Sequence, residues 1–179
     1  METLIEKIKG LFRNFSSPSP MPSYDSNLGA LVAISVTSKG MMQLGYGVVM
    51  TVINVDTNES FTSKPMGRIS PHSVLQNIPE GKYRVCRLEI PLGDLIYINE
   101  SQDLLAYFGL LEFKKGSAYY LGDFMGKRKI GRENVFHLSL ESQNIPEKLI
   151  KKLKGAGINL SEIEIIKSFP DEKTQLLLY

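Results

Sequence analysis

The sequence predicts a mainly β protein: an antiparallel β-sandwich with an N-terminal amphipathic helix and a C-terminal helical segment. Three observations lead to this fold class. Short apolar or alternating runs recur between residues 28 and 142, separated by the Gly, Pro and Asn residues that favour turns. The apolar residues of the first 15 positions instead follow a helical period, and a helical period returns after Asn144.

The composition is that of one globular domain with short appendages. The chain has 179 residues, of which 42% are hydrophobic and 22% charged, so a fold of this size can bury about 70% of its surface. Its one cysteine, Cys86, excludes an internal disulfide and is interpreted as a small buried residue. The net charge of +2 is too small to indicate nucleic acid as a partner.

The sequence shows neither a membrane span nor a signal peptide. No run approaches the roughly 18 continuous apolar residues that a spanning helix requires, and charges interrupt the apolar residues of the N-terminus. We therefore expect a cytoplasmic protein, or an envelope-associated one if the natural chain is trimmed at its N-terminus.

Residues 1–15 are predicted to form the amphipathic helix. Their apolar residues fall on one helical stripe, with most charges on the other side. Because so short a helix is marginal in water, the stripe needs a surface to lie on. We take four of its residues as interaction residues: Leu4, Ile8, Leu11 and Phe12. Residues 16–27, with three prolines and five serines, predict an extended linker.

Residues 28–142 are predicted to form the sandwich, which begins with two core strands. Residues 28–36 are a continuous apolar run, and residues 46–55 are rich in β-branched side chains. A Pro-Glu-Gly-Lys turn at 79–82 then leads into a strand over Tyr83–Ile90.

The second half of the sandwich is predicted to contain a hairpin and an alternating strand. Residues 106–113 and 118–124 flank Lys-Lys-Gly-Ser, whose glycine suits a tight turn. Residues 135–141 alternate, with the even-numbered side chains facing inward. Twelve residues are predicted to lie in the core: Ala30, Val32, Ile34, Val48, Met50, Val52, Leu88, Leu110, Leu121, Phe136, Leu138 and Leu140.

Residues 143–179 are predicted to be a helix and an extension packed on the sandwich. The helix covers residues 145–157 and turns Leu149, Ile150 and Leu153 toward the body. The following segment is compatible with strand or helix, and the apolar C-terminal tail could add an edge strand.

Two short motifs resemble a known family. The stretch Asn77–Val85 resembles the turn and strand of transthyretin-like (prealbumin-like) sandwich modules of bacterial proteins. The stretch Lys115–Asp123 resembles a strand of small envelope lipoproteins with a similar fold, although Ser117 stands where those have Lys. The resemblance implies a seven-stranded sandwich used for binding or scaffolding, with no catalytic residues attached to these motifs.

A basic cluster is the main candidate binding site on the predicted domain. Its residues are Lys127, Arg128, Lys129 and Arg132. On a loop or hairpin tip they could meet a phosphate, an acidic partner or anionic lipid; the alternative is a solvated turn that protects a sheet edge. Only three residues separate Gly122 from Gly126, and no hydroxyl follows the lysine, so a P-loop is excluded.

No catalytic or metal site is readable in the sequence. His72, His137 and Cys86 lack the close spacing of zinc ligands, and no nucleophile elbow is present. His137 is interpreted as a solvent-facing strand residue, and His72 as a loop residue. We therefore expect no metal, no cofactor and no catalytic residues.

The function that these features favour is a non-catalytic binding or scaffolding module acting through protein–protein contacts. One alternative is a peripheral membrane protein anchored by the N-terminal helix; another is an enzyme whose site is assembled in space. Residues 2–15 carry a net charge of only +1, so attraction to anionic lipid is weak. We therefore expect the helix to dock on protein, in the same chain or in a homo-oligomer.

Overall fold

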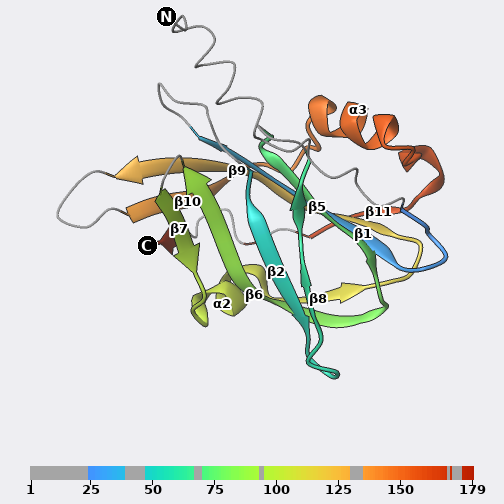
Figure 1. Ribbon diagram of the computed structural model, residues 1–179, viewed down its shortest axis with the longest axis horizontal. Coiled ribbons are helices and arrows are strands. Elements are labelled where there is room, and N and C mark those ends of the chain that lie inside the picture. Colours follow the sequence, from blue (N-terminus) through green and yellow to red (C-terminus); the bar gives the residue numbers. More distant parts are fainter. Residues whose placement is uncertain are drawn as a thin grey trace, which may run out of the picture.

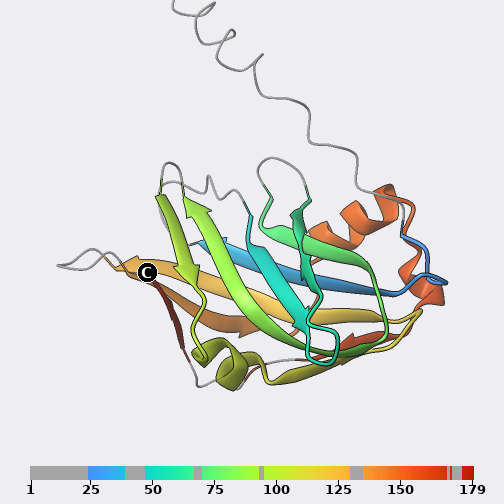
Figure 2. The same cartoon turned by 60° about the horizontal axis from the view of Figure 1, so that its bottom comes forward.

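The computed structural model describes residues 24–38, 47–66, 70–92, 95–129, 135–168, 170 and 175–179. Within these residues the chain is mainly β, as predicted, and its strands form two sheets that face each other across one core (Figures 1 and 2). The predicted N-terminal helix, with its interaction residues Leu4, Ile8, Leu11 and Phe12, lies outside the described residues.

The larger sheet is built around strands β1 and β9. In spatial order it contains β12 (Leu176–Leu178), β10 (Val135–Ser142), β9 (Ala118–Lys129), β1 (Ala30–Ser38), β5 (His72–Ile78) and β4 (Lys64–Pro65). A short strand, β11 (Ile165–Lys167), also pairs with the first residues of β9. The sheet departs from a purely antiparallel arrangement, because β1 and β11 both run parallel to β9.

The smaller sheet is centred on the long strand β6. Its order is β3 (Ser60–Thr62), β2 (Val49–Asn54), β6 (Gly81–Leu92) and β7 (Leu95–Asn99). A further strand, β8 (Leu110–Phe113), pairs with the start of β6, whereas β7 pairs with its end. Since β2 occupies the other edge of β6, β7 and β8 lie end to end along one edge, with helix α2 (Asp103–Phe108) between them.

The core between the sheets contains most of the predicted core residues. Ten of the twelve are buried in one cluster, and Leu140 is half-buried against it. The prediction for Leu110 was wrong, because this side chain is 62% exposed. The residues just before Leu110 form helix α2, so the strand begins at Leu110 itself. In this strand Leu111 and Phe113 face the core, and Leu110 faces solvent.

The predicted hairpin around residues 114–117 is also wrong. Strand β8 belongs to the smaller sheet and β9 to the larger one, so the two strands do not pair. The turn itself forms, with Gly116 at a φ of 77°, but it carries the chain from one sheet to the other. Turn chemistry is local and does not determine which strand the next segment will join.

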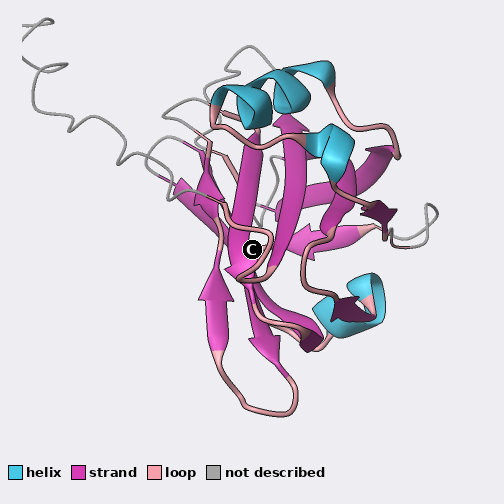
Figure 3. Cartoon of the chain, turned by 90° about the vertical axis from the view of Figure 1, so that its right-hand side faces the viewer, coloured by secondary structure: helices cyan, strands magenta, loops and turns pink. Residues whose placement is uncertain are grey.

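The C-terminal residues are integrated into the larger sheet. Helix α3 (Glu147–Gly155) lies over the outer face of that sheet (Figures 1 and 3), and a 3₁₀ turn, η1 (Leu160–Glu162), and β11 follow it. Leu149 and Leu153 are buried under α3 as predicted, but Ile150 is 40% exposed and does not face the body. Tyr179 exchanges two backbone hydrogen bonds with Ile98 of β7 and so links the two sheets.

Gly29 is expected to be essential for the pairing of β1 with β5. A Cβ at this position would lie 2.3 Å from the carbonyl oxygen of Ile78, which is backbone and cannot rotate away. Gly29→Ala should therefore lower the free energy of unfolding by about 1–3 kcal/mol, measured by urea denaturation followed by circular dichroism.

Gly155→Ala is the matched control for this prediction. A Cβ there would meet nothing within 4 Å, and alanine favours the helix, so stability should be unchanged or higher by up to about 1 kcal/mol. Equal stability of the two variants would contradict the close approach of β1 and β5.

Candidate functional site

Strand β1 is buried on both of its faces, and its outer face forms one side of the candidate site. Ala30, Val32, Ile34 and Val36 of β1 enter the core between the sheets. Leu31 and Ala33 point the other way and pack in a second cluster with Leu149 and Leu153 of α3. Helix α3 therefore takes the place of solvent on this side of the larger sheet.

A polar cluster continues the outer face of β1 beyond Ala33. Ser35 Oγ and His72 Nδ1 share a hydrogen bond of 2.8 Å, and both residues are almost fully buried. The backbone N–H of His72 donates to Ser70 Oγ over 3.2 Å. Lys152 of α3 donates from Nζ to the same Ser70 oxygen and to the carbonyl of Met66, at 2.7 and 2.9 Å. This lysine thus attaches α3 to the segment before β5.

The electrostatics of the polar cluster keep His72 neutral at neutral pH. Burial lowers the pKa of His72 to about 4, and the positive charges of Lys152 and Lys148 add to this effect. Among the described residues its Nε2 has no hydrogen-bond partner. Burial also lowers the pKa of Lys152, with a further contribution from Lys148. Burial raises the pKa of Tyr120, and hydrogen bonding with Ser35 offsets part of that rise.

Ser35 and His72 do not form a working nucleophile and base in this arrangement. Nucleophilic catalysis needs space for a reacting atom about 3 Å from the nucleophile. Ser35 has no exposed surface, and His72 is only 2% exposed. The described geometry makes this pair a buried hydrogen bond that joins β1 to β5 in the larger sheet.

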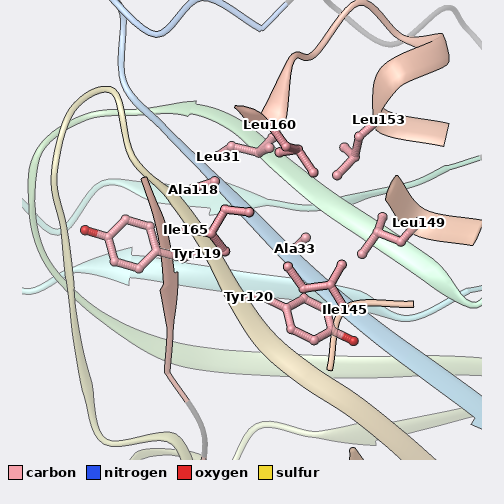
Figure 4. Close-up of a pocket in the computed structure, with 10 residues that line it drawn as sticks. All are labelled: Leu31, Ala33, Ala118, Tyr119, Tyr120, Ile145, Leu149, Leu153, Leu160 and Ile165. Carbon is pink, nitrogen blue, oxygen red and sulfur yellow. The ribbon is translucent and has the colours of Figure 1, made fainter. Parts of the chain in front are cut away.

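An apolar pocket adjoins the polar cluster, between α3 and the larger sheet. Figure 4 shows the side chains that line it, which come from β1, β9, α3, η1, β11 and the segment before α3. The free volume of the pocket is about 10 Å³, which is roughly what one water molecule needs and far below the range of about 300–1,000 Å³ for small-molecule sites.

The outer face of the smaller sheet is the second candidate surface, called here the β6 face. It consists of the outward-facing residues of four strands: Val49, Thr51 and Ile53 of β2; Lys82, Arg84, Arg87 and Glu89 of β6; Ile96 and Ile98 of β7; and Leu110 and Glu112 of β8. In Figure 1, β7, β6 and β2 lie in the foreground, and no described helix covers them. Arg87 is fixed by ion pairs with Glu89 and Glu100.

The structure changes the interpretation of the predicted basic cluster. Strand β9 extends to Lys129. Of the two predicted settings, which were a loop or a hairpin tip, the structure is nearer the second, because Lys127, Arg128 and Lys129 lie at the end of a strand that pairs antiparallel with the start of β10. The exposed Lys127 is opposite His137, whereas Arg132 and the side chains of Arg128 and Lys129 lie outside the described part of the molecule. Strand β9 continues through these residues because β10 pairs with it there: Val135 lies opposite Lys129, and Phe136 lies opposite Arg128.

The polar cluster was not found from the sequence, and His72 was misplaced. It belongs to strand β5 and is buried, although a loop was predicted there. Ser35 is the one hydroxyl residue within the run over residues 28–36, and it is the sequence signal for a buried polar partner. Lys152 lies on the helix predicted over residues 145–157, and its bonds to Ser70 and Met66 depend on tertiary packing that the sequence does not show.

Comparisons with known proteins do not assign a function to either candidate surface. No family model matches the chain, and no curated protein matches it significantly. In the described part of the chain, His, Cys, Asp and Glu do not gather in any group of three that could hold a metal ion. No described helix combines the length and hydrophobicity needed to cross a membrane.

The neutral, buried state of His72 predicts a specific pH dependence of stability. The folded pKa of about 4 lies below the ordinary value near 6.5, so the unfolded chain binds the proton first as pH falls. Stability should be complete above pH 6.5 and decline as pH falls toward 4. The loss by pH 4.5 should be about 1–3 kcal/mol.

Urea denaturation between pH 7 and pH 4.5 measures this effect. His72→Asn removes the titrating group and should flatten the decline, whereas His137→Gln, which changes the other histidine, should retain it. An equal pH dependence in wild type and His72→Asn would show that His72 is not the buried neutral group described here.

Proposed function

We propose that the protein is a non-catalytic binding module that works through protein–protein contacts, and that the β6 face is its contact surface. The observation that carries the proposal is the exposure of large apolar side chains on this regular sheet face. Leu110 is 62% exposed and Ile96 is 56% exposed. The finer fold assignment is part of the proposal: a β-sandwich of the transthyretin-like kind, supported by two sheets that share one core.

The chemistry of the β6 face resembles that of a protein interface. Across the sheet, Arg84 lies between Ile53 and Leu110, and Glu89 lies between Val49 and Ile98. Arginine is enriched at protein interfaces, and the buried core of an interface is more apolar than the rest of the surface. The strands also hold the side chains in fixed positions, which lowers the ordering cost of binding.

We propose a second copy of the chain as the occupant of this face. At one end of β6, Lys82 and Arg84 with Glu112 opposite Lys82 leave a net charge of +1, and at the other end Arg87 with its partners Glu89 and Glu100 leaves a net charge of −1. A two-fold axis in the interface, perpendicular to the strands, places the positive end of one copy against the acidic end of the other. Such a face is complementary to itself, as a symmetric dimer requires.

Leu110→Glu tests this surface in the full-length protein. The substitution places a carboxylate among apolar contacts and occurs twice in a symmetric dimer. Loss of a central contact commonly costs about 2 kcal/mol or more, so the dissociation constant should rise by at least about tenfold. Sedimentation velocity over a range of protein concentrations measures this change, with circular dichroism to verify folding.

Ile150→Glu is the control, because this residue is also partly exposed but lies on α3, away from the β6 face. It should leave the dimer intact. A full-length chain that sediments as a monomer at every concentration, or a dimer that Leu110→Glu does not weaken, would overturn the proposed surface.

A further inference from the structure

The exposed residues on and beside helix α3 form a positively charged surface, called here the α3 face. The helix lies on the outer side of the larger sheet (Figure 3) and buries Leu149 and Leu153 against it. Its four lysines are all exposed. The α3 face consists of six exposed lysines and two exposed isoleucines: Lys64, Lys148, Lys151, Lys152, Lys154, Lys167, Ile150 and Ile165.

The sheet register places Lys64 and Lys167 on the same side of the larger sheet as α3. Lys64 of β4 lies opposite Val74, whose side chain packs in the cluster under α3. Lys167 of β11 lies opposite Tyr120, which belongs to the same cluster. Because directly paired residues share a face of a sheet, one lysine flanks the helix beside β5 and the other beside β9.

The lysines of the α3 face are not neutralised by acidic neighbours in the described part of the chain. The ion pair on α3 joins Lys151 to Glu147 over 3.9 Å, and both side chains are largely exposed, so the pair contributes little. Lys152 donates to uncharged oxygens of the segment before β5. Burial lowers the pKa of Lys152, and the positive charge of Lys148 lowers it further.

Positive charge is therefore concentrated on one side of the molecule. The elements β4, α3 and β11 together contain six lysines and one acidic residue, Glu147. Their net charge is +5, whereas the whole chain carries +2. Glu164 precedes β11, but its charge acts on Tyr119, which packs in the core between the sheets and so lies on the other side of the larger sheet.

The two isoleucines add apolar groups to one flank of the helix. Ile150 is 40% exposed and Ile165 is 37% exposed. With 3.6 residues per turn, Ile150 lies on the opposite flank of α3 from Lys152, which bonds to the segment before β5. Ile150 therefore points toward the side of β9 and β11, where Ile165 stands beside the α3 leucines (Figure 4).

The composition of the α3 face favours a lipid surface over a protein or a nucleic acid. Hot spots of protein interfaces are enriched in arginine, tyrosine and tryptophan, and the face contains none of these. It also lacks the aromatic rings on which single-stranded bases stack. Lysines beside aliphatic side chains suit the interface of a bilayer, because ammonium groups reach the lipid phosphates while apolar groups enter the headgroup region.

We propose that the α3 face binds the surface of an anionic phospholipid bilayer, with its lysines at the lipid phosphates and Ile150 in the headgroup region. Each lysine near such a surface contributes about fivefold in affinity. The α3 face and the β6 face lie on the outer sides of different sheets, so the inference does not rest on the proposed dimer.

A tryptophan reporter on α3 tests this proposal in the full-length chain. The sequence contains no tryptophan, so Ile150→Trp supplies a single fluorophore on the face. Vesicles of phosphatidylcholine and phosphatidylserine in equal parts should shift its emission to shorter wavelength, and phosphatidylcholine alone should not. Leu105→Trp, at a similarly exposed position on α2, should show no shift with either vesicle.

A pair of charge reversals tests the lysines. Lys151→Glu combined with Lys154→Glu should lower the affinity for the mixed vesicles by at least about tenfold, measured by cosedimentation. Lys114→Glu combined with Lys115→Glu makes the same change in net charge on the exposed turn between β8 and β9. Because salt screens distant charges, this control should lower the affinity by less than about twofold.

Four results would overturn the proposal: no binding to the mixed vesicles, binding without a shift in Ile150→Trp, equal weakening by the two charge variants, or tighter binding to single-stranded RNA than to the vesicles. The second would assign lipid binding to another part of the chain, and the last would assign the face to a nucleic acid. A shift retained when Leu110→Glu is added supports the proposal and separates it from the dimer.

Discussion

The burial of β1 on both faces is the interaction on which the rest of the structure depends. Val32 and Ile34 fill the core between the sheets, and Leu31 and Ala33 fill the space under α3. Each fully buried aliphatic side chain of this size contributes about 1.5–3 kcal/mol relative to an exposed one. A strand of this kind cannot lie at a solvated face, so the larger sheet needs the C-terminal residues as a cover.

This cover makes the two outer faces of the molecule different. On the larger sheet, Lys152 and the Ser35–His72 hydrogen bond replace water for the polar groups buried under α3. On the smaller sheet the strands alternate between inward apolar and outward mixed residues, as antiparallel sheets with one solvated face do. The proposed binding role follows from this difference: the β6 face is open to a partner, whereas α3 already covers the outer face of the larger sheet.

The sequence predicted the positions of the strands and helices better than which strands pair with one another. The continuous apolar run of β1 and the alternation of β10 were readable because burial on one or both faces determines a strand's pattern. The change of sheet between β8 and β9 was not readable, since the turn at Gly116 suits either a hairpin or a crossing. Helix α2 ends just before Leu110 and shifts the alternation there. The hydrogen bonds of Ser35 with His72 and of Lys152 with Ser70 join residues far apart in the chain, so no local pattern reveals them.

The packing of α3 on β1 is tested most directly by two neighbouring residues of the helix. Leu149 is fully buried against the outer face of β1, whereas Ile150 is 40% exposed. Leu149→Ala should lower the free energy of unfolding by about 2–5 kcal/mol, and Ile150→Ala should lower it by about 1 kcal/mol or less. Urea denaturation of the full-length chain measures both. An equally small loss in the two variants would show that α3 does not provide the burial on which β1 depends.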